Sequence, residues 1–317
     1  MSGSYQRINY RLRPAKCAER KMIVDTLRRL TPFGRVAEYR YVGMGSPYFV
    51  DFALIHKSLG ITNLVSIERD KHNKPRFEFN KPFDCIKMQY GEATVVLAQL
   101  TWQDRNVVWL DYDGVLEPSI LSDVSHVCSV AVPGSVLIVS VNAEKPETTD
   151  AVPDRLNVLR DRLGADRIPA GLAAKDFAGW GAAGVYRRIL SNQVEEALVT
   201  RNGPVPPASR LLFKQLFNFN YKDGARMLTF GGIIYSTDQK PLVADAEFSE
   251  LSFVASGKKA TLIEMPNLTP KEIGHLDSML PTNNAAKLCK SVPVPPSDAK
   301  KYAEIYRYFP SFSEIES

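Results

Sequence analysis

Two aspartates in the stretch NVVWLDYDG, Asp111 and Asp113, directly follow a run of apolar residues that is typical of a buried strand. A carboxylate in such a position can help to remove a proton from a hydroxyl group, or can hold a Mg²⁺ ion that acidifies that group. We predict that Asp111 and Asp113 form the reacting end of a site.

A glycine turn earlier in the chain has the features of a nucleotide-binding loop. Gly43, Gly45 and Ser46 belong to YVGMGS, which follows an apolar run and precedes a predicted helix, whose free backbone N–H groups would face a ligand. Glu68 ends the next apolar run, 23 residues after Gly45, where its carboxylate can accept two hydrogen bonds from a ribose. Arg69 follows it directly. The spacing predicts a nucleotide-like ligand.

Two common nucleotide ligands do not fit this loop. The dinucleotide fingerprint G-x-G-x-x-G requires a third small residue, and this chain has Tyr48 there. The sequence also contains no G-x-x-x-x-G-K-[ST] loop for the phosphates of ATP. A different nucleotide-like cofactor is therefore favoured.

A parallel sheet is needed to bring these residues together. Short apolar runs alternate with helical patterns from residue 36 to residue 142, which predicts an α/β fold with a doubly wound, Rossmann-like sheet. Two further strand patterns flank the turn Lys222-Asp223-Gly224 and predict a terminal antiparallel hairpin. We expect strands at Val36–Val42, Asn63–Glu68, Cys85–Tyr90, Asn106–Tyr112 and Ser135–Asn142, and helices at Lys16–Leu30, Pro47–Leu59, Glu92–Leu100 and Pro118–Val130.

Five segments are predicted along the chain. They are a basic N-terminal helical segment (1–30), a Rossmann-like cofactor-binding core (31–144), a helical insertion that covers the substrate (145–210), the terminal hairpin of the core (211–236) and a C-terminal extension (237–317).

Positive charge is concentrated at the N-terminal end. Residues 1–40 carry ten Lys or Arg against three acids, a net charge of +7 in a chain whose total is +5. Arg13, Lys16, Arg20 and Lys21 belong to this segment. They predict contact with an anionic group, of which nucleic acid is the commonest macromolecular example. A solvated helix face is the alternative interpretation.

Other signals exclude several classes of protein. Four scattered cysteines and four scattered histidines form no C-x-x-C or H-E-x-x-H pattern, so neither a disulfide framework nor a protein-built metal site is predicted. The N-terminal residues have no apolar signal segment, and the longest apolar run, Cys128–Val141, is too short to cross a bilayer. A soluble, cytoplasmic protein without a membrane partner is expected.

The order of five βα units followed by a hairpin resembles the class I S-adenosylmethionine-dependent methyltransferase fold, over roughly residues 30–236. YVGMGS resembles its glycine motif, SIE its ribose-binding acid, GEA its adenine contact, and WLDYDG the place where cofactor and substrate meet. RPAKCAERKM, YVGMGSPYFVDF, DYDG and YRYFPSF are, more narrowly, similar to a bacterial O-methyltransferase family. The resemblance implies S-adenosylmethionine as cofactor, contacted by Gly43, Gly45, Ser46, Glu68, Arg69, Glu92, Ala93, Asp111 and Tyr112.

The resemblance leaves the methyl acceptor open. DYDG departs from the Asn/Asp-Pro-Pro-Tyr of enzymes that methylate exocyclic amino groups of DNA bases, so a hydroxyl oxygen is expected. In a small-molecule enzyme, Asp111 or Asp113 would act as base or bind Mg²⁺. In an RNA ribose enzyme, Lys16 or Lys21, Asp111 and Lys145 would follow the order of a Lys-Asp-Lys-Glu tetrad, whose glutamate is missing from LTFGGIIY.

A catalytically inactive protein of the same fold is the competing hypothesis. It would bind nucleic acid or a partner protein through the basic N-terminal segment. Retained affinity for the cofactor separates the two hypotheses, because a pure scaffold does not need Glu68 and Glu92 in binding positions.

Overall fold

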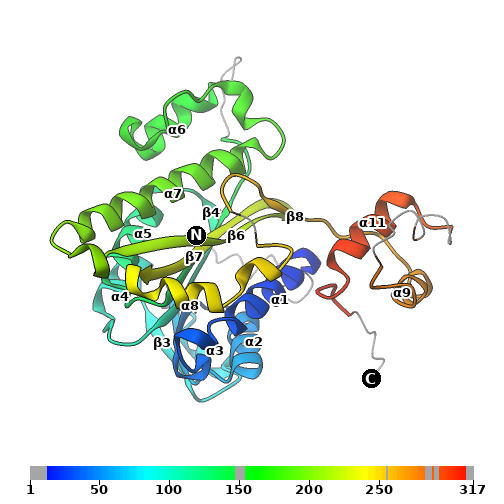
Figure 1. Cartoon of the computed structure of the whole chain (residues 1–317), viewed down its shortest axis with the longest axis horizontal. Coiled ribbons are helices and arrows are strands. Elements are labelled where there is room, and N and C mark those ends of the chain that lie inside the picture. The colour runs from blue at the N-terminus through cyan, green and yellow to red at the C-terminus, as the bar shows by residue number, and fades with distance from the viewer. Residues whose placement is uncertain (1–12, 147–153, 255, 283–287, 289–292, 312–317) are drawn as a thin grey trace.

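A mixed sheet of eight strands lies at the centre of the computed structural model, which describes residues 13–146, 154–254, 256–282, 288 and 293–311 (Figure 1). The strand order is β3-β2-β1-β4-β5-β7-β6-β8. The strands are β1 (Arg40–Met44), β2 (Asn63–Glu68), β3 (Ile86–Tyr90), β4 (Asn106–Val115), β5 (Ser135–Asn142), β6 (Leu211–Asp223), β7 (Ala225–Ser236) and β8 (Thr261–Ile263).

The first five strands are parallel to one another, whereas β7 is antiparallel to both β5 and β6. The short strand β8 pairs in parallel with the outer side of β6. The doubly wound α/β sheet ending in an antiparallel hairpin is therefore confirmed. Because β1 to β5 are parallel, their carboxyl ends lie at one edge of the sheet, where such folds bind ligands.

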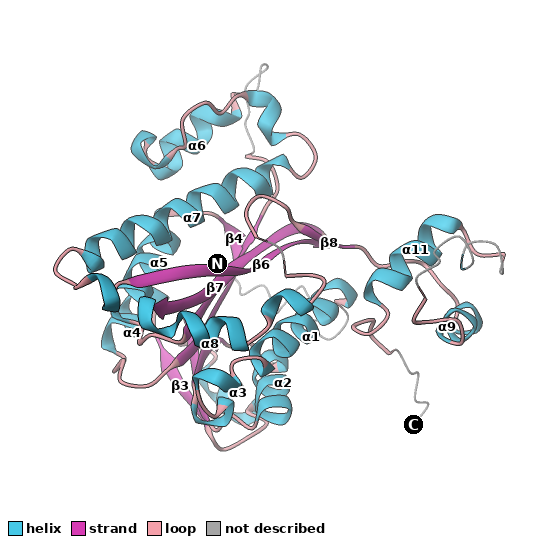
Figure 2. Ribbon diagram, in the orientation of Figure 1, coloured by secondary structure: helices cyan, strands magenta, loops and turns pink. Residues whose placement is uncertain are grey.

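Helices cover both faces of the sheet (Figure 2). The sheet separates two hydrophobic cores, one on each face. Along β4, Val107 and Trp109 point into the first core, whereas Val108 and Leu110 point into the second. The first core packs under α1 (Pro14–Arg28), α2 (Val50–Leu59) and α8 (Lys240–Asp245), and the second under α4 (Ala93–Gln99), α5 (Pro118–Val130) and α7 (Gly181–Asn202). The remaining α-helices with described bounds are α3 (Lys74–Asn80), α6 (Arg155–Leu163), α9 (Pro270–Asp277) and α11 (Pro296–Ile305).

Two elements begin three or four residues later than the sequence pattern predicts. The first strand begins at Arg40, because Val36–Glu38 forms a 3₁₀ turn instead. The helix expected from Pro47 begins at Val50, because Phe49 has a left-handed backbone (φ 45°) that cannot continue a right-handed helix. The helix Pro118–Val130 and the strands Asn63–Glu68 and Ser135–Asn142 have the predicted bounds.

The predicted helical insertion 145–210 divides into two parts in the structure. Helix α7 packs against α5, β6 and β7 and contributes buried residues from Ala182 to Leu198 to the second core. It is therefore an integral layer of the sheet fold, and the role of residues 145–210 as a substrate cover stays a prediction. Helix α6 lies outside α7, farther from the sheet (Figure 1).

The last part of the C-terminal extension, from α9 onward, forms a small body beside the sheet domain (Figure 1), whereas α8 and β8 belong to the sheet fold. The apolar cluster of this small body includes Leu276 of α9 and Tyr302 of α11. The segment after α11 is tied to the outer side of α1, where Lys21 Nζ donates to the carbonyl of Phe309 at 2.9 Å and Tyr308 donates to Asp25 at 2.7 Å.

Among the described residues, no helix combines the length and the apolar character that a membrane span requires.

Candidate functional site

A cavity of about 920 Å³ opens at the carboxyl ends of β1, β2, β3 and β4. Its size falls within the range of pockets that hold cofactors and small ligands, roughly 300–1,000 Å³. Nine residues that the sequence analysis singled out line it, namely Gly45, Ser46, Glu68, Arg69, Glu92, Ala93, Asp111, Tyr112 and Asp113. The sheet thus brings together residues that the sequence places in four separate segments.

The glycine turn after β1 places backbone close to β2. A Cβ atom at Gly45 would lie 2.2 Å from Ser66 Oγ, a buried hydroxyl on β2 for which the structure shows no hydrogen-bond partner. A side chain at position 45 would therefore displace Ser66 Oγ, and packing alone accounts for the glycine.

Gly43 was predicted to contact the cofactor, but the structure places it away from the cavity. It lies within β1 and does not line the cavity. A Cβ atom there would lie 2.6 Å from the hydroxyl of Tyr41, so this glycine makes room for the buried Tyr41 side chain. The motif could not indicate this role of Gly43, because the role follows from the position of the Tyr41 side chain. That side chain packs against Phe52 of α2.

We expect Gly45→Ala to lower the free energy of unfolding by about 1–3 kcal/mol, because the added methyl group overpacks the contact with Ser66. The double variant Gly45→Ala/Ser66→Ala removes the opposing hydroxyl and should recover most of this loss, as measured by urea denaturation. Equal stability of the two variants would show that Ser66 is not the obstacle.

Glu68 is fixed at the end of β2 by its own loop. Its Oε1 accepts a hydrogen bond from the backbone N–H of Asp70 at 2.7 Å, and the side chain lines the cavity. Burial raises the pKa of this carboxyl above its ordinary value, and the hydrogen bond from Asp70 opposes the shift. Across the cavity mouth, the exposed Arg69 and Glu92 approach to 4.0 Å.

A buried pair that the sequence analysis missed forms another wall. Tyr112 donates to Asp123 Oδ2 at 2.5 Å and so joins β4 to α5. Burial raises the pKa of the Tyr112 phenol, and Asp123 reinforces the shift. The sequence signal for Asp123 is weak, because a single acid in the helical pattern PSILSDVSHV resembles a solvated position.

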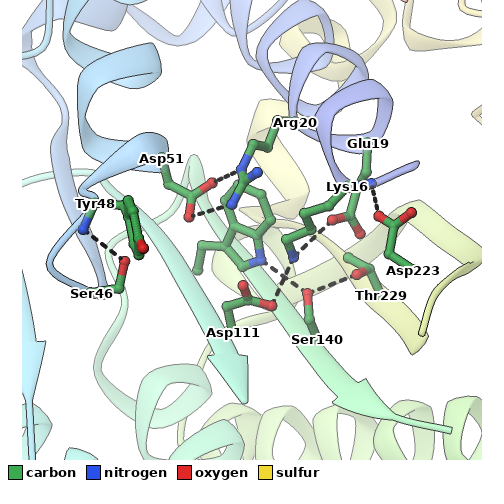
Figure 3. A network of polar contacts seen from close by, with 11 residues as sticks. Lys16, Glu19, Arg20, Ser46, Tyr48, Asp51, Asp111, Ser140, Asp223 and Thr229 are labelled. Atoms are coloured by element: carbon green, nitrogen blue, oxygen red, sulfur yellow. Dashed lines mark hydrogen bonds and ion pairs between the residues drawn. The ribbon is translucent and has the colours of Figure 1, made fainter. Parts of the chain in front are cut away.

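The reacting end contains a buried network that joins α1 to β4 (Figure 3). Lys16 Nζ lies 2.8 Å from Asp111 Oδ1 and 2.8 Å from Glu19 Oε2, and neither Lys16 nor Glu19 is exposed. The ammonium group also lies 4.6 Å from the centre of the Trp109 ring. Asp111 alone of these residues lines the cavity.

The first turn of α1 is anchored on the terminal hairpin. Asp223, at the end of β6, accepts hydrogen bonds from the backbone N–H groups of Ala15 (3.2 Å) and Lys16 (2.8 Å). On the floor of the network, Trp109 donates to Ser140, which in turn is 2.7 Å from Thr229. Lys16 is therefore held by its backbone and by its side chain.

Burial and charge act in opposite directions on these groups. Burial alone would raise the pKa of Asp111, but the ion pair with Lys16 lowers that pKa below its ordinary value. Burial would lower the pKa of Lys16, but Asp111 and Glu19 raise it well above its ordinary value. For Glu19, burial prevails and its pKa is raised.

A second ion pair lies beside the first. Arg20, which is 4% exposed, pairs with Asp51 in the first turn of α2, and Asp51 lines the cavity (Figure 3). Sequence reasoning missed Asp51, because the two partners are 31 residues apart and no motif links them.

The other predicted basic residues do not line the cavity. Lys145 is exposed and does not line the cavity, so it does not join Asp111 as a tetrad would require. Lys21 faces the C-terminal segment, and Arg13 is buried at the start of α1. Lys16 and Arg20 are enclosed by acids rather than placed on a surface. The basic segment thus offers fewer cations to a nucleic acid than its composition indicates.

Within the described ranges, no group of three or more His, Cys, Asp or Glu side chains could hold a metal ion.

Comparisons with known proteins give a family match over nearly the whole chain. A family model described as "Putative O-methyltransferase" matches residues 8–317. No curated protein matches the sequence significantly. Among solved structures, the chain is similar to an O-methyltransferase from Bacillus cereus in complex with SAH (11% identity, 69% of this chain and 81% of that chain, TM-score 0.36). It is also similar to Trm1 from Pyrococcus horikoshii with S-adenosyl-L-methionine (9% identity, 76% and 60%, TM-score 0.46).

Proposed function

The chain belongs to the methyltransferase family that matches residues 8–317, and from this premise we propose that it transfers the methyl group of S-adenosylmethionine to a hydroxyl oxygen. The proposal rests on one observation, which is that the glycine turn, Glu68 and Asp111 line the same cavity. Each of the three comes from the carboxyl end of a different parallel strand, the position at which doubly wound sheets bind nucleotides.

The residues present fit this cofactor. Glu68 would accept hydrogen bonds from the ribose, and the backbone at Gly45, which has no room for a side chain, would approach the methionine part. Glu92 and Ala93 would lie at the adenine, while Asp111 and Asp113 mark the reacting end. When bound, the cofactor supplies an electrophilic methyl group, and the protein has to align the acceptor oxygen with it.

Calorimetric titration with S-adenosylmethionine and S-adenosylhomocysteine tests the proposal. We expect Glu68→Ala to weaken binding by about 1–3 kcal/mol, which is roughly 5- to 150-fold, because the ribose loses a charge-assisted partner. Glu38→Ala is the matched control, because Glu38 is exposed and lies outside the cavity.

Each outcome has a distinct meaning. Absence of binding by the folded wild-type protein would contradict the cofactor assignment as a whole. Equal affinity of Glu68→Ala and the wild type would remove Glu68 from the site and leave the cofactor in place. Binding without transfer to any acceptor would favour the inactive binding subunit.

A further inference from the structure

A buried carboxylate on the wall of the cavity has one oxygen without a partner. Asp123 belongs to α5, is 1% exposed and lines the cavity. Its Oδ2 accepts the hydrogen bond from the Tyr112 hydroxyl, whereas its Oδ1 is buried and has no hydrogen-bond partner among the described residues. An unpaired carboxylate oxygen is costly to bury, so a ligand that donates a hydrogen bond to Oδ1 would bind more tightly.

The two faces of β4 separate Asp123 from the reacting end. Asp111 meets Lys16 of α1 on one face of the sheet, and the next residue, Tyr112, meets α5 on the other face. This alternation is expected of a strand, whose successive side chains point to opposite faces. Asp123 therefore faces a part of the cavity that is distinct from the place where the methyl group would be transferred.

The start of α4 lies beside Asp123. Glu92, Ala93 and Thr94 line the same cavity, and Thr94 and Glu92 both affect the pKa of Asp123. Burial raises that pKa, whereas the hydroxyls of Tyr112 and Thr94 oppose the shift and so favour the ionised form. The resemblance to class I methyltransferases assigns Glu92 and Ala93 to the adenine of the cofactor. The unpaired Oδ1 is thus at the adenine end of the proposed cofactor site.

We propose that Asp123 Oδ1 accepts a hydrogen bond from the 6-amino group of the adenine, and that this contact makes the site selective for a 6-aminopurine over a 6-oxopurine. The proposal rests on the proposed function and assigns it a specificity-determining residue. An ionised carboxylate can only accept hydrogen bonds, so it suits an amino group and repels the carbonyl oxygen of a 6-oxopurine.

Tyr112 is a positioning residue for this contact. Its hydroxyl occupies Oδ2 at 2.5 Å, which orients the carboxylate and leaves Oδ1 for the ligand. The phenol keeps its proton because burial and the neighbouring Asp123 raise its pKa. Tyr112 therefore acts on the cofactor through Asp123.

Calorimetric titration with two ligands that differ only at position 6 of the purine tests the proposal. S-adenosylhomocysteine carries an amino group there, and S-inosylhomocysteine carries a carbonyl group. We expect the wild type to bind the adenosyl compound on the order of 10²-fold more tightly, because the inosyl compound places an oxygen against Oδ1. Affinities within about threefold of each other would overturn the proposal and leave the cofactor assignment in place. If the folded protein binds neither ligand, the proposed function fails, and the adenine contact fails with it.

Asp123→Asn adds a readout that a merely structural role would not change. The Tyr112 hydroxyl still needs an acceptor, so the amide oxygen should face Tyr112 and the amide N–H₂ group should face the cavity. That group can donate to a 6-oxopurine, so we expect the preference for the adenosyl compound to fall at least about tenfold, with tighter binding of the inosyl compound than by the wild type. An equal loss of affinity for both ligands would mean that Asp123 only supports the fold, and the proposal would be wrong.

Glu117→Gln is the matched control for this variant. Glu117 directly precedes α5 and lines the same cavity, but it is exposed. Its replacement removes one negative charge from the cavity and should leave the ratio of the two affinities unchanged, since exposed charges are screened by water. An equal fall of the ratio in both variants would attribute the preference to the overall charge of the cavity and would overturn the assignment of Asp123.

Discussion

Replacing Lys16 by methionine is expected to lower the free energy of unfolding by about 3–5 kcal/mol at neutral pH, because removal of one partner leaves buried charge uncompensated. Lys16 serves two carboxylates, Asp111 and Glu19, at 2.8 Å each, and methionine fills the space of its stem without replacing its charge. Equilibrium urea denaturation of the wild type and the variant measures the difference.

Lys21→Met is the matched control on the same helix. Lys21 makes one hydrogen bond, to the carbonyl of Phe309, so its replacement should cost only about 1 kcal/mol. If the two variants were equally stable, the buried network would not be what holds α1 against the sheet.

The deficit of Lys16→Met should also depend on pH. In the wild type, the pKa of Asp111 is lowered, so its contribution to stability is present above its unfolded pKa and is lost as pH falls through its folded pKa. Without Lys16, burial would raise the folded pKa of both Asp111 and Glu19. Groups with a raised folded pKa lose stability as pH rises, so the deficit should be larger at about pH 7 than at about pH 5. The opposite trend would contradict the assigned charges.

The sequence predicts which residues line the cavity at the ends of β1 and β2 better than it predicts the contacts around Asp111, because the first depend on short-range interactions and the second on long-range ones. Gly45 and Glu68 are set by local rules, since each directly follows or ends an apolar strand of a βα series. The alternation of strands and helices likewise determined the sheet, because each unit buries its own apolar face. These features need only neighbouring residues.

The reacting end depends on contacts between distant segments. Lys16 and Asp111 are 95 positions apart, and their meeting requires α1 to pack across the ends of β4 and β6. Composition showed a basic N-terminal segment but not that its cations are buried against acids. Gly43 illustrates the same limit on a smaller scale, because its role follows from the position of the Tyr41 side chain.

Asp111→Asn is expected to slow methyl transfer by on the order of 10²-fold while leaving the fold and the binding of S-adenosylhomocysteine largely intact. Asparagine keeps the shape and an oxygen acceptor for Lys16, but it removes the negative charge with which we propose that Asp111 orients the acceptor, and misplacement by about 1 Å can cost 10²-fold. Transfer of labelled methyl to a hydroxyl acceptor found by screening measures the rate, and urea denaturation checks the fold.

Asp113→Asn distinguishes the two neighbouring acids. Asp113 lines the same cavity but is exposed to water, so its replacement should change the rate by less than about threefold, since exposed charges contribute little. If instead Asp113→Asn stopped transfer and Asp111→Asn did not, the acceptor would bind at the cavity mouth. The buried network of α1 would then serve stability alone, and Asp111 would have no part in orienting the acceptor.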